Sequence, residues 1–386
     1  MRVVLTGGGT AGHVLPNIAV IEELRERFGS RDLEVLYIGS EKGPEAKLCA
    51  RYGIPFRSIA TGKLRRYFAW ENFTDPFRVI KGVYDAWNIL REWRPDVVFS
   101  KGGFVSAPVV LAAARLGVPV ILHEADVTPG LANKFCARFA KVVCVSWEET
   151  MTYFPDRVAA KKILLTGMPV RRELASGVAE RGREFLGFDG RKPILLVMGG
   201  SLGAASVNAL VRKVLPKLLK DFDVVHVVGA GVMKDTNETK NVNDMSNTYD
   251  VTQNIQPGYR AFPYLQDELF DVYACSDVVV SRAGASALAE LCVLGKPSVL
   301  IPLGSSQSRG DQIVNAEILS AAGAAEVYVS DWSEPSKFIE MVCVLGHGEE
   351  GARKRSALSK GMQVFGARHR RAAGQIAEVI MGVFQY

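Results

Sequence analysis

The sequence predicts an α/β protein made of two Rossmann-like, doubly wound domains that face each other across a cleft. Two observations lead to this prediction. A strand, a glycine turn and a helix follow one another at the start of the chain, and the same layout begins again near residue 194. Several other apolar runs are short and rich in β-branched residues, as in strands that are buried on both faces of a parallel sheet. Such a repeated layout indicates two similar domains.

Composition limits the classes of function. With 386 residues, of which 48% are hydrophobic and 23% charged, the chain can fill two cores and is not disordered. The net charge of +6 comes without a long basic run, so we expect no nucleic-acid partner, whereas an anionic membrane surface remains possible. The six cysteines form no CxxC pair and the five histidines no HExxH motif, which predicts no metal site. No signal peptide or apolar run of about 18 residues is evident, so we expect a cytoplasmic protein with peripheral membrane contact.

The first strand, residues 3–5, leads into the turn GGGTAGH at 7–13 and then a helix through 17–24. This spacing matches the dinucleotide fingerprint, which keeps an NAD-dependent dehydrogenase as an alternative. However, His13 directly follows the last glycine, and the second strand runs into Gly39 and Ser40 rather than an acidic ribose ligand. These features favour a loop that grips a phosphorylated substrate.

Residues 62–93 interleave basic and aromatic side chains. Such a mixture is typical of proteins that lie at the headgroup boundary of a membrane, although aromatic residues on a helix can also be core. The basic members are Lys63, Arg65, Arg66, Arg78, Lys81 and Arg91, with Arg94 directly after the segment, and the aromatic ones are Tyr67, Phe68, Trp70, Phe73, Phe77, Tyr84, Trp87 and Trp93.

A second glycine turn, SKGGF at 100–104, follows the strand at 97–99. The next strand, 120–122, ends in His123, Glu124 and, two residues on, Asp126. Ligands of an open α/β sheet sit at the carboxyl ends of its strands, so these side chains are candidates for a site, or else they stabilise the loop. Strands near 141–145 and 163–165 complete the first domain, and residues 166–171 resemble a linker.

In the second half, the strand 194–198, the turn GGSLG at 199–203 and a helix from Ala205 repeat the opening layout. The polar stretch 237–254 is expected to be a loop, and 268–275 a helix. The strand 278–280 then turns at Gly284 into a helix that ends at 295–297, before a strand at 298–301. The backbone N–H groups at the Gly284 helix start suit a phosphate, and Glu290, about two turns on, suits the paired hydroxyls of a ribose.

These motifs resemble, in order and spacing, those of the MurG family of peptidoglycan N-acetylglucosaminyltransferases, in a form close to the Gram-positive branch. The likeness covers nearly the whole chain. Its segments are GGTAGH at 8–13, KGGFVS at 101–106, His123 with Glu124, GGSLGA at 199–204, SRAGASALAE at 281–290 and DQIVNA at 311–316. The chain departs from the commonest pattern at Ala11, Asp126, Met168 and Leu202. Of these, Asp126 matters most, because an ionised carboxylate cannot donate a hydrogen bond.

The resemblance implies a glycosyltransferase of the B type with inverting chemistry and no cofactor. It would move N-acetylglucosamine from UDP-N-acetylglucosamine to the 4-hydroxyl of the muramyl sugar of lipid I, at the cytoplasmic face of the membrane. Residues 1–166 would hold the lipid-linked muramyl-pentapeptide acceptor and residues 167–366 the UDP-sugar, and the final helix, 367–386, would pack back on the first domain. A transferase acting on another lipid such as diacylglycerol is the alternative, as is a non-catalytic sugar-nucleotide-binding protein.

The resemblance also implies roles for particular residues. Glu290 would hold the ribose, and Gln312 the hydroxyls of the transferred sugar. The diphosphate of the donor would contact Ala283, Gly284, Ala285, Ser286 and Ser201. The sugar side of the cleft would be formed by Thr10, Ala11 and Gly12, and the diphosphate of the acceptor would meet Gly102 and Gly103 together with Gly8 and Gly9. Further substrate contacts are expected from Arg171, Leu265 and Asp311.

The reaction also needs a base to remove the proton of the acceptor hydroxyl. His13 is the first candidate, because it ends a glycine loop and an unperturbed histidine has a pKa near 6.5. Glu124 and Asp126 are its rivals, and His13 could instead only bind the acceptor's phosphate. No metal is expected, because the helix start at Gly284 can stabilise the leaving diphosphate.

Overall fold

The computed structural model describes residues 1–29, 32–41, 43–62, 71–155, 158, 162–200, 203–229, 257–304, 310–329 and 334–384, without the side chains of 71–76 and 384. The chain divides into two compact units. Unit 1 comprises Met1–Arg171 and Ala367–Tyr386, and unit 2 comprises Arg172–Gly366. The boundary in the contacts therefore falls between Arg171 and Arg172.

Unit 1 is built on a seven-stranded parallel sheet with the strand order β3-β2-β1-β4-β5-β6-β7. Its central strands are fully buried because apolar residues point to both faces: Val3 and Leu5 join one core cluster and Val4 joins the other. The strands are β1 (Arg2–Thr6), β2 (Glu34–Ser40), β3 (Phe56–Ile59), β4 (Val97–Ser100), β5 (Val120–Glu124), β6 (Val142–Val145) and β7 (Lys162–Leu165).

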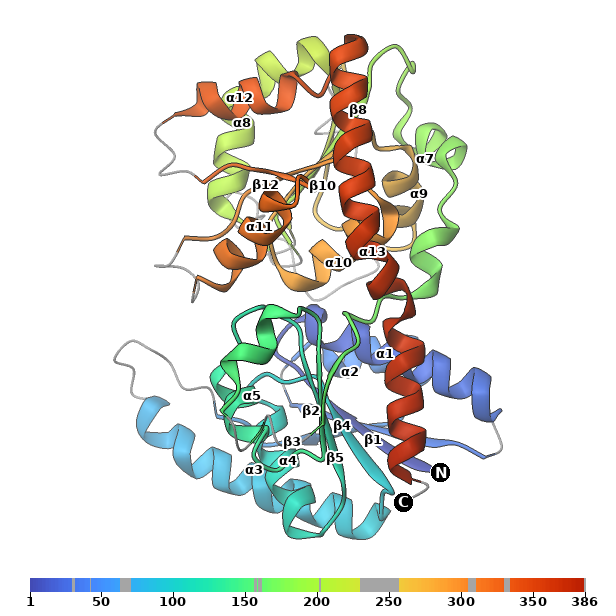
Figure 1. The fold of residues 1–386 in the computed structure, drawn as a ribbon, viewed down its shortest axis with the longest axis vertical. Helices are drawn as coiled ribbons and strands as arrows, with labels where there is room; N and C mark the ends of the chain where they lie inside the picture. Colours follow the sequence, from blue (N-terminus) through green and yellow to red (C-terminus); the bar gives the residue numbers. More distant parts are fainter. Residues whose placement is uncertain are drawn as a thin grey trace, which may run out of the picture. The chain divides into compact units, whose positions relative to one another are not determined.

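Helices cover both faces of this sheet (Figure 1). Residues of α1 (Ala11–Phe28), α2 (Glu45–Arg51) and the end of α13 (Gly348–Phe384) pack on one face. Residues of α3 (Glu71–Trp93), α4 (Ser106–Arg115) and α5 (Leu131–Cys136) pack on the other. The unit also contains the short 3₁₀ helix η1 (Glu149–Tyr153). The carboxyl ends of the strands, where ligands of such sheets bind, carry the two glycine turns.

Unit 2 contains a six-stranded parallel sheet with the order β10-β9-β8-β11-β12-β13. The strands are β8 (Ile194–Met198), β9 (Asp223–Val227), β10 (Tyr259–Phe262), β11 (Val278–Ser281), β12 (Ser298–Leu300) and β13 (Glu326–Val327). The helices are α7 (Ala179–Leu186), α8 (Ala205–Asp221), α9 (Glu268–Cys275), α10 (Ala285–Leu294), α11 (Asp311–Ala321) and α12 (Pro335–Cys343), with the 3₁₀ helix η2 (Arg172–Ser176). Val197 and Val280 pack with α8 and α12 on one face.

The fold class predicted from the sequence is confirmed: both units are doubly wound parallel α/β structures. The final helix is longer than expected. It begins at Gly348 instead of Ala367, so one helix runs from unit 2 into unit 1. Its end packs on the unit 1 core through Ile376, Ala377 and Ile380. The expected polar loop at 237–254 lies outside the described residues.

None of the described helices combines the length and the apolar character that a membrane span requires. The aromatic side chains of the aromatic and basic segment differ in exposure. Phe77 and Tyr84 are exposed, whereas Trp87 and Trp93 are partly buried and pack against the core. The predicted members Lys63, Arg65, Arg66, Tyr67, Phe68 and Trp70, and the side chain of Phe73, lie outside the described part of the chain.

Candidate functional site

The first glycine turn of unit 1 is clamped by a buried carboxylate. The backbone N–H of Gly9, which has φ +90°, donates to Glu45 Oε1 at 2.7 Å, and Ser40 Oγ donates to both carboxylate oxygens at 3.1 Å. A Cβ at Gly8 would lie 1.9 Å from the same Oε1, so no other residue fits there unless Glu45 moves. Glu45 is completely buried and was missed in the sequence, where nothing ties it to a turn 36 residues earlier.

The second glycine turn touches the first. Gly102 and Gly103 follow β4 with φ of +89° and +85°, which favours glycine. A Cβ at Gly103 would lie 2.9 Å from the carbonyl oxygen of Gly8 and 3.6 Å from Nε2 of His13. The two turns and the His13 ring, which the sequence separates by about 90 residues, therefore meet at the carboxyl edge of one sheet.

His13 lies in the first turn of α1. Its backbone N–H donates to the carbonyl of Thr10 at 3.1 Å, and Thr10 is the N-cap residue with extended backbone (φ −149°, ψ 158°). Thr10 is exposed, and Ala11, Gly12 and His13 are half-buried. The first turn of a helix has backbone N–H groups without intrahelical partners, so this edge can receive an anion.

Glu124, at the end of β5, has both oxygens engaged. Oε1 accepts from the backbone N–H groups of Ala125 at 2.8 Å and Asp126 at 3.0 Å. Oε2 accepts from the N–H of Gly130 at 3.1 Å and from Asn133 Nδ2 at 2.8 Å. The carboxylate is 4% exposed and shapes the loop between β5 and α5.

His123, the residue before it, is fully buried. Nε2 lies 2.8 Å from the carbonyl oxygen of Gly167. Burial lowers the pKa of His123 well below its usual value, and the charge of Lys101 adds to this. His123 is therefore neutral and holds residue 167 against the sheet, while Asp126 is half-buried beyond it.

Of the other predicted substrate contacts, Arg171 lies apart from these turns and Ser201 lies outside the described residues. Arg171, the last residue of the first segment of unit 1, donates from Nη1 to the hydroxyl of Tyr52 at 3.0 Å. Ser201 and Leu202 lie outside the described residues, so what was expected of them stays a prediction.

In unit 2, β11 leads directly into the start of α10. Gly284 is the N-cap residue, and apart from Gly284 and its two chain neighbours no heavy atom of the described chain lies within 4 Å of an added Cβ there, so the helix start faces open space. Ala283 and Ala285 are buried and Ser286 is half-buried. Glu290 lies further along the same helix, half-buried, and its Oε2 accepts from the hydroxyl of Tyr273 at 3.4 Å.

Arg282 connects three parts of this edge. Its Nη1 donates to the carbonyl of Gly199 at 3.3 Å and would lie 3.6 Å from a Cβ at Gly200. Burial lowers the pKa of Arg282, and the nearby Asp311 opposes that change. The guanidinium thus links the turn after β8 with the starts of α10 and α11. The sequence offered one signal for it, a cation two residues before the helix N-cap.

The start of α11 supplies two more predicted residues. Gln312 Oε1 accepts from the backbone N–H of Leu303 at 3.2 Å, and Asp311 Oδ1 accepts from the N–H of Gln312 at 3.1 Å. Leu265 is buried beside the start of α9. Among the described residues, no group of three or more His, Cys, Asp or Glu side chains could hold a metal.

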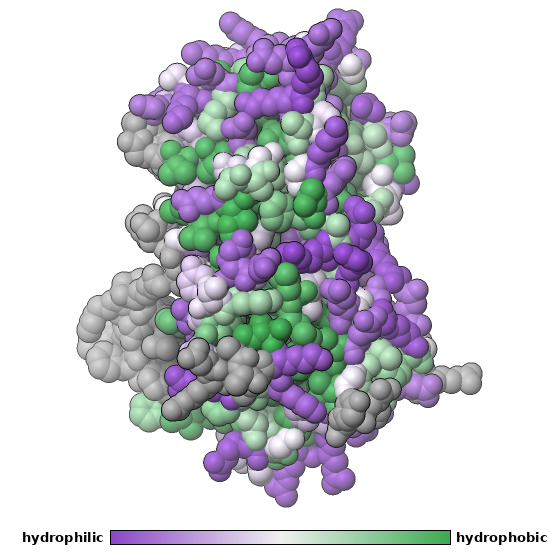
Figure 2. Space-filling view, viewed as in Figure 1, coloured by the Kyte–Doolittle hydropathy of each residue, from purple (hydrophilic) through white to green (hydrophobic). Residues whose placement is uncertain are grey.

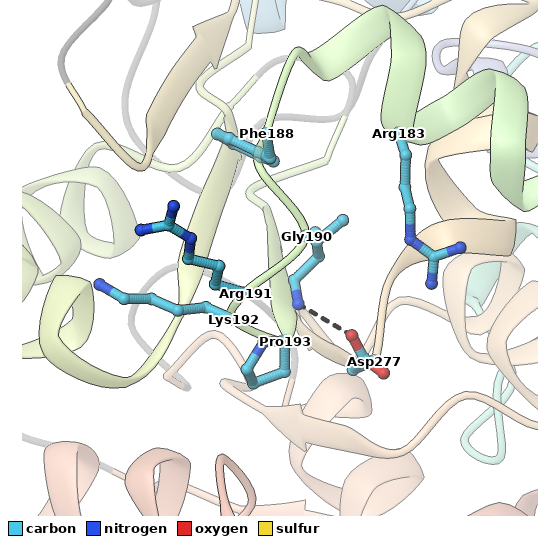
Figure 3. Close-up of a pocket in the computed structure, with 8 residues that line it drawn as sticks. Arg183, Phe188, Gly190, Arg191, Lys192, Pro193 and Asp277 are labelled. Atoms are coloured by element: carbon cyan, nitrogen blue, oxygen red, sulfur yellow. Dashed lines mark hydrogen bonds between the residues drawn. The ribbon is translucent and has the colours of Figure 1, made fainter.

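Two cavities contain none of the predicted site residues. One, of about 270 Å³, lies at the amino ends of β8 and β11, where Ile194 N–H donates to Asp277 Oδ2 at 2.9 Å (Figure 3). Arg183, Arg191 and Lys192 also line it. The other, of about 430 Å³, belongs to unit 1 and is lined by Leu131, Lys134, Phe135, Arg138, Tyr153, Pro155 and Val158. The amino edge of a parallel sheet is not where its ligands bind, so the first is not the candidate site.

Comparisons with known proteins found similarity in both units. The N-terminal domain model of glycosyltransferase family 28 matches residues 3–145 and the C-terminal domain model matches residues 194–368. The UDP-N-acetylglucosamine–N-acetylmuramyl-(pentapeptide) pyrophosphoryl-undecaprenol N-acetylglucosamine transferase of Geobacillus thermodenitrificans is 48% identical over 331 residues, 86% of each chain. The protein of the same name from Lachnospira eligens is 47% identical over 330 residues, again 86% of each.

Solved structures are also similar. The crystal structure of Acinetobacter baumannii MurG superposes with a TM-score of 0.67 at 25% identity and covers 99% of both chains. The UDP-N-acetylglucosamine 2-epimerase from Neisseria meningitidis gives a TM-score of 0.64 at 15% identity over 99% of this chain and 100% of that one. At that identity the likeness concerns the fold alone.

Proposed function

The chain belongs to glycosyltransferase family 28, and from that premise we propose that it transfers N-acetylglucosamine from UDP-N-acetylglucosamine to the 4-hydroxyl of the muramyl sugar of lipid I, giving lipid II. It is a hexosyltransferase of peptidoglycan synthesis, and the transfer inverts the anomeric centre. The observation that carries the proposal is the meeting of both glycine turns with His13 at one sheet edge of a chain related to these transferases.

Unit 2 binds the donor. The open helix start at Gly284 receives the diphosphate, with Ala283, Ala285 and Ser286 around it. Ser201, which lies outside the described residues, is proposed to contact the same diphosphate. Arg282 adds a positive charge at the same edge. Glu290 accepts hydrogen bonds from the ribose hydroxyls, and Gln312 and Asp311 meet the sugar hydroxyls. Leu265 borders the base.

Unit 1 binds the acceptor. The turns at Gly8–Gly9 and Gly102–Gly103 border its diphosphate, and Thr10, Ala11 and Gly12 border the sugar. The N–H of Gly9 is already bound to Glu45, so the backbone donors for the diphosphate come from the other residues of the turns and from the start of α1. Arg171 makes a further contact with substrate. His13 takes the proton from the attacking hydroxyl as that oxygen bonds to the anomeric carbon, while the bond to UDP breaks. The developing charge on UDP is stabilised by the α10 start, so no step of this scheme needs a metal.

The burial of Glu124 favours His13 as the general base. Glu124 is buried and its oxygens already accept four hydrogen bonds, so it cannot approach an acceptor hydroxyl without dismantling its loop. Asp126 is half-buried on that loop and remains the second candidate.

The enzyme works at the cytoplasmic face of an anionic membrane as a peripheral protein. The support for this lies in unit 1, where apolar residues reach the surface (Figure 2). On α3, Phe77, Ile80 and Tyr84 are 74%, 67% and 63% exposed. Arg78 and Lys81 are exposed on the same helix, so apolar and basic side chains occur together, as headgroup binding requires.

The test is a transfer assay with labelled UDP-N-acetylglucosamine and either lipid I or diacylglycerol as acceptor. We expect a labelled disaccharide product with lipid I and none with diacylglycerol. Transfer to diacylglycerol alone would contradict the proposed acceptor. Binding of the donor without transfer to either lipid would mark the chain as a non-catalytic binding protein.

A further inference from the structure

Lys101 is buried next to both glycine turns. It follows β4 directly and precedes Gly102, and its Cβ lies 3.0 Å from the position of an added Cβ at Gly7. The side chain is 1% exposed. An ammonium group is therefore enclosed at the sheet edge where the acceptor's diphosphate is proposed to bind.

No described residue offers this ammonium a hydrogen bond. Lys101 Nζ is buried without a partner among the described residues, and so is Nδ1 of His123. The carboxylates of Glu124 and Asp126 lie close enough to favour the charged form of Lys101. Both oxygens of Glu124, however, are bound to other donors.

Stability alone does not explain a lysine at this position. Burial of an ammonium without a hydrogen-bond partner is strongly unfavourable, and an apolar residue of similar volume usually keeps or raises stability. The burial lowers the pKa of Lys101 to about 8. A charge kept against such a penalty points to a role in binding an anion.

We propose that Lys101 determines specificity for an acceptor whose headgroup carries a diphosphate. This inference rests on the proposed function. The ammonium lies behind the paired turns, and it attracts the anion through the protein interior and offsets the repulsion from Glu124 and Asp126. A neutral lipid headgroup gains nothing from it. At an effective dielectric constant of about 20, the attraction between opposite charges that are not in direct contact changes affinity roughly ten- to a hundredfold.

The charge state of Lys101 should be visible in the pH profile. The titratable groups that interact with it are His123 and Glu124 of β5 and Asp126 of the following loop, with His369 of α13 beyond His123. His123 and His369 are neutral over the useful range, because burial lowers both pKa values. As pH rises through about 8, the free enzyme loses the Lys101 proton and acceptor kcat/KM should fall.

The test compares Lys101→Met with Lys141→Met, which removes an exposed lysine at the amino edge of the same sheet. With lipid I as acceptor, we expect Lys101→Met to raise acceptor KM about tenfold or more, to leave kcat and donor KM within about twofold, and to lose the alkaline fall in kcat/KM. Its thermal midpoint should equal or exceed that of the wild type. Lys141→Met should match the wild type in every measurement.

Lys101→Arg supplies the conservative variant. Arginine stays protonated above pH 12, so we expect a near-normal acceptor KM without the alkaline fall. An unchanged acceptor KM and pH profile in Lys101→Met would overturn the inference, and so would loss of the fold in that variant, because the lysine would then be structural. A wild-type chain that fails to use lipid I would instead count against the proposed function.

Discussion

The candidate site residues of the two units fall into two groups, which differ in burial and in hydrogen bonding. Glu45 and Glu124 are buried carboxylates whose oxygens accept hydrogen bonds from backbone or side-chain donors, and both hold a loop in shape. His13 and Glu290 are half-buried on the first turns of their helices or just beyond. The residues that hold loops and those proposed to contact substrate should therefore respond differently to mutation: changes to the first should alter stability, and changes to the second should alter kinetics.

His13→Ala should lower kcat by about 10²–10⁴, with little change in donor KM, because a positioned general base contributes on that order. Steady-state kinetics with both substrates varied gives the two constants. His347→Ala removes an exposed histidine of unit 2 and should leave kcat unchanged. Near-normal kcat with a raised acceptor KM would show that His13 binds the acceptor and would pass the role of base to Asp126.

Glu290→Ala should weaken UDP-N-acetylglucosamine binding by about one to two orders of magnitude, because charge-assisted hydrogen bonds to two hydroxyls are worth roughly 1.5–3 kcal/mol. Titration calorimetry measures the affinity, and circular dichroism checks the fold. Glu317→Ala, an exposed carboxylate on α11, is the matched control. Unchanged affinity for UDP in folded Glu290→Ala would remove the ribose assignment.

Among the elements, α3 shows how one helix serves two purposes. Ala86 and Leu90 are buried in the unit 1 core, whereas Phe77, Ile80 and Tyr84 follow the three- and four-residue spacing of a single exposed face. Trp87 belongs to the packed side, where Arg91 lies over its ring at 5.1 Å. Among the described residues this exposed face is apolar and packs on no core, which is the reason for proposing a membrane surface as its partner.

Ile80→Glu should reduce binding to anionic vesicles several-fold, because it places a negative charge on the proposed membrane face. Wild-type binding should require anionic lipid and fall as salt rises, since screening weakens the basic contribution. Vesicle sedimentation measures both effects. Val364→Glu changes a side chain on α13 that is 74% exposed and should not alter binding. Equal binding of the wild type to neutral and anionic vesicles would contradict the proposed electrostatic contribution to membrane binding.

For the whole molecule, local sequence patterns predicted the features that depend on local physics. Apolar β-branched runs predicted the strands, and runs of glycine predicted the turns. Gly9, Gly102 and Gly103 do have positive φ in the structure. The Glu45 clamp and the Arg282 bridge were not predicted, because each joins residues far apart in the chain. The early start of α13 was missed as well, since residues 348–366 are polar enough to lack a clear apolar stripe.

Histidine burial occurs in both units and gives the whole molecule a common response to acid. His369 of unit 1 and His226 of unit 2 each have a pKa lowered to about 4, mainly by burial. His226 lies between Asn208 Oδ1, at 3.0 Å, and the hydroxyl of Tyr259, at 3.1 Å. His369 Nδ1 accepts from the backbone N–H of Met168 at 3.0 Å. Protonation of either ring in the folded state would place a charge in the interior.

The sign of the effect follows from the proton balance. The unfolded chain protonates these histidines near pH 6.5, whereas the folded chain does so near pH 4, so the unfolded state binds more protons in between. Stability from the neutral rings is thus fully present above pH 6.5 and is lost as pH falls toward 4. Each ring should lower the free energy of unfolding by about 2 kcal/mol at pH 5.

The urea midpoints should therefore be lower at pH 5 than at pH 7.5. One variant measures how much of this difference comes from His369. His369→Gln keeps an acceptor for the Met168 N–H but cannot be protonated, so the transition of unit 1 should lose the part of its acid sensitivity that comes from His369, while the buried His123 keeps its own part. The transition of unit 2, which contains His226, should keep its own. If His369→Gln unfolds in acid with the same pH dependence as the wild type in both transitions, protonation of His369 does not contribute to acid unfolding, and other groups control the acid stability of unit 1.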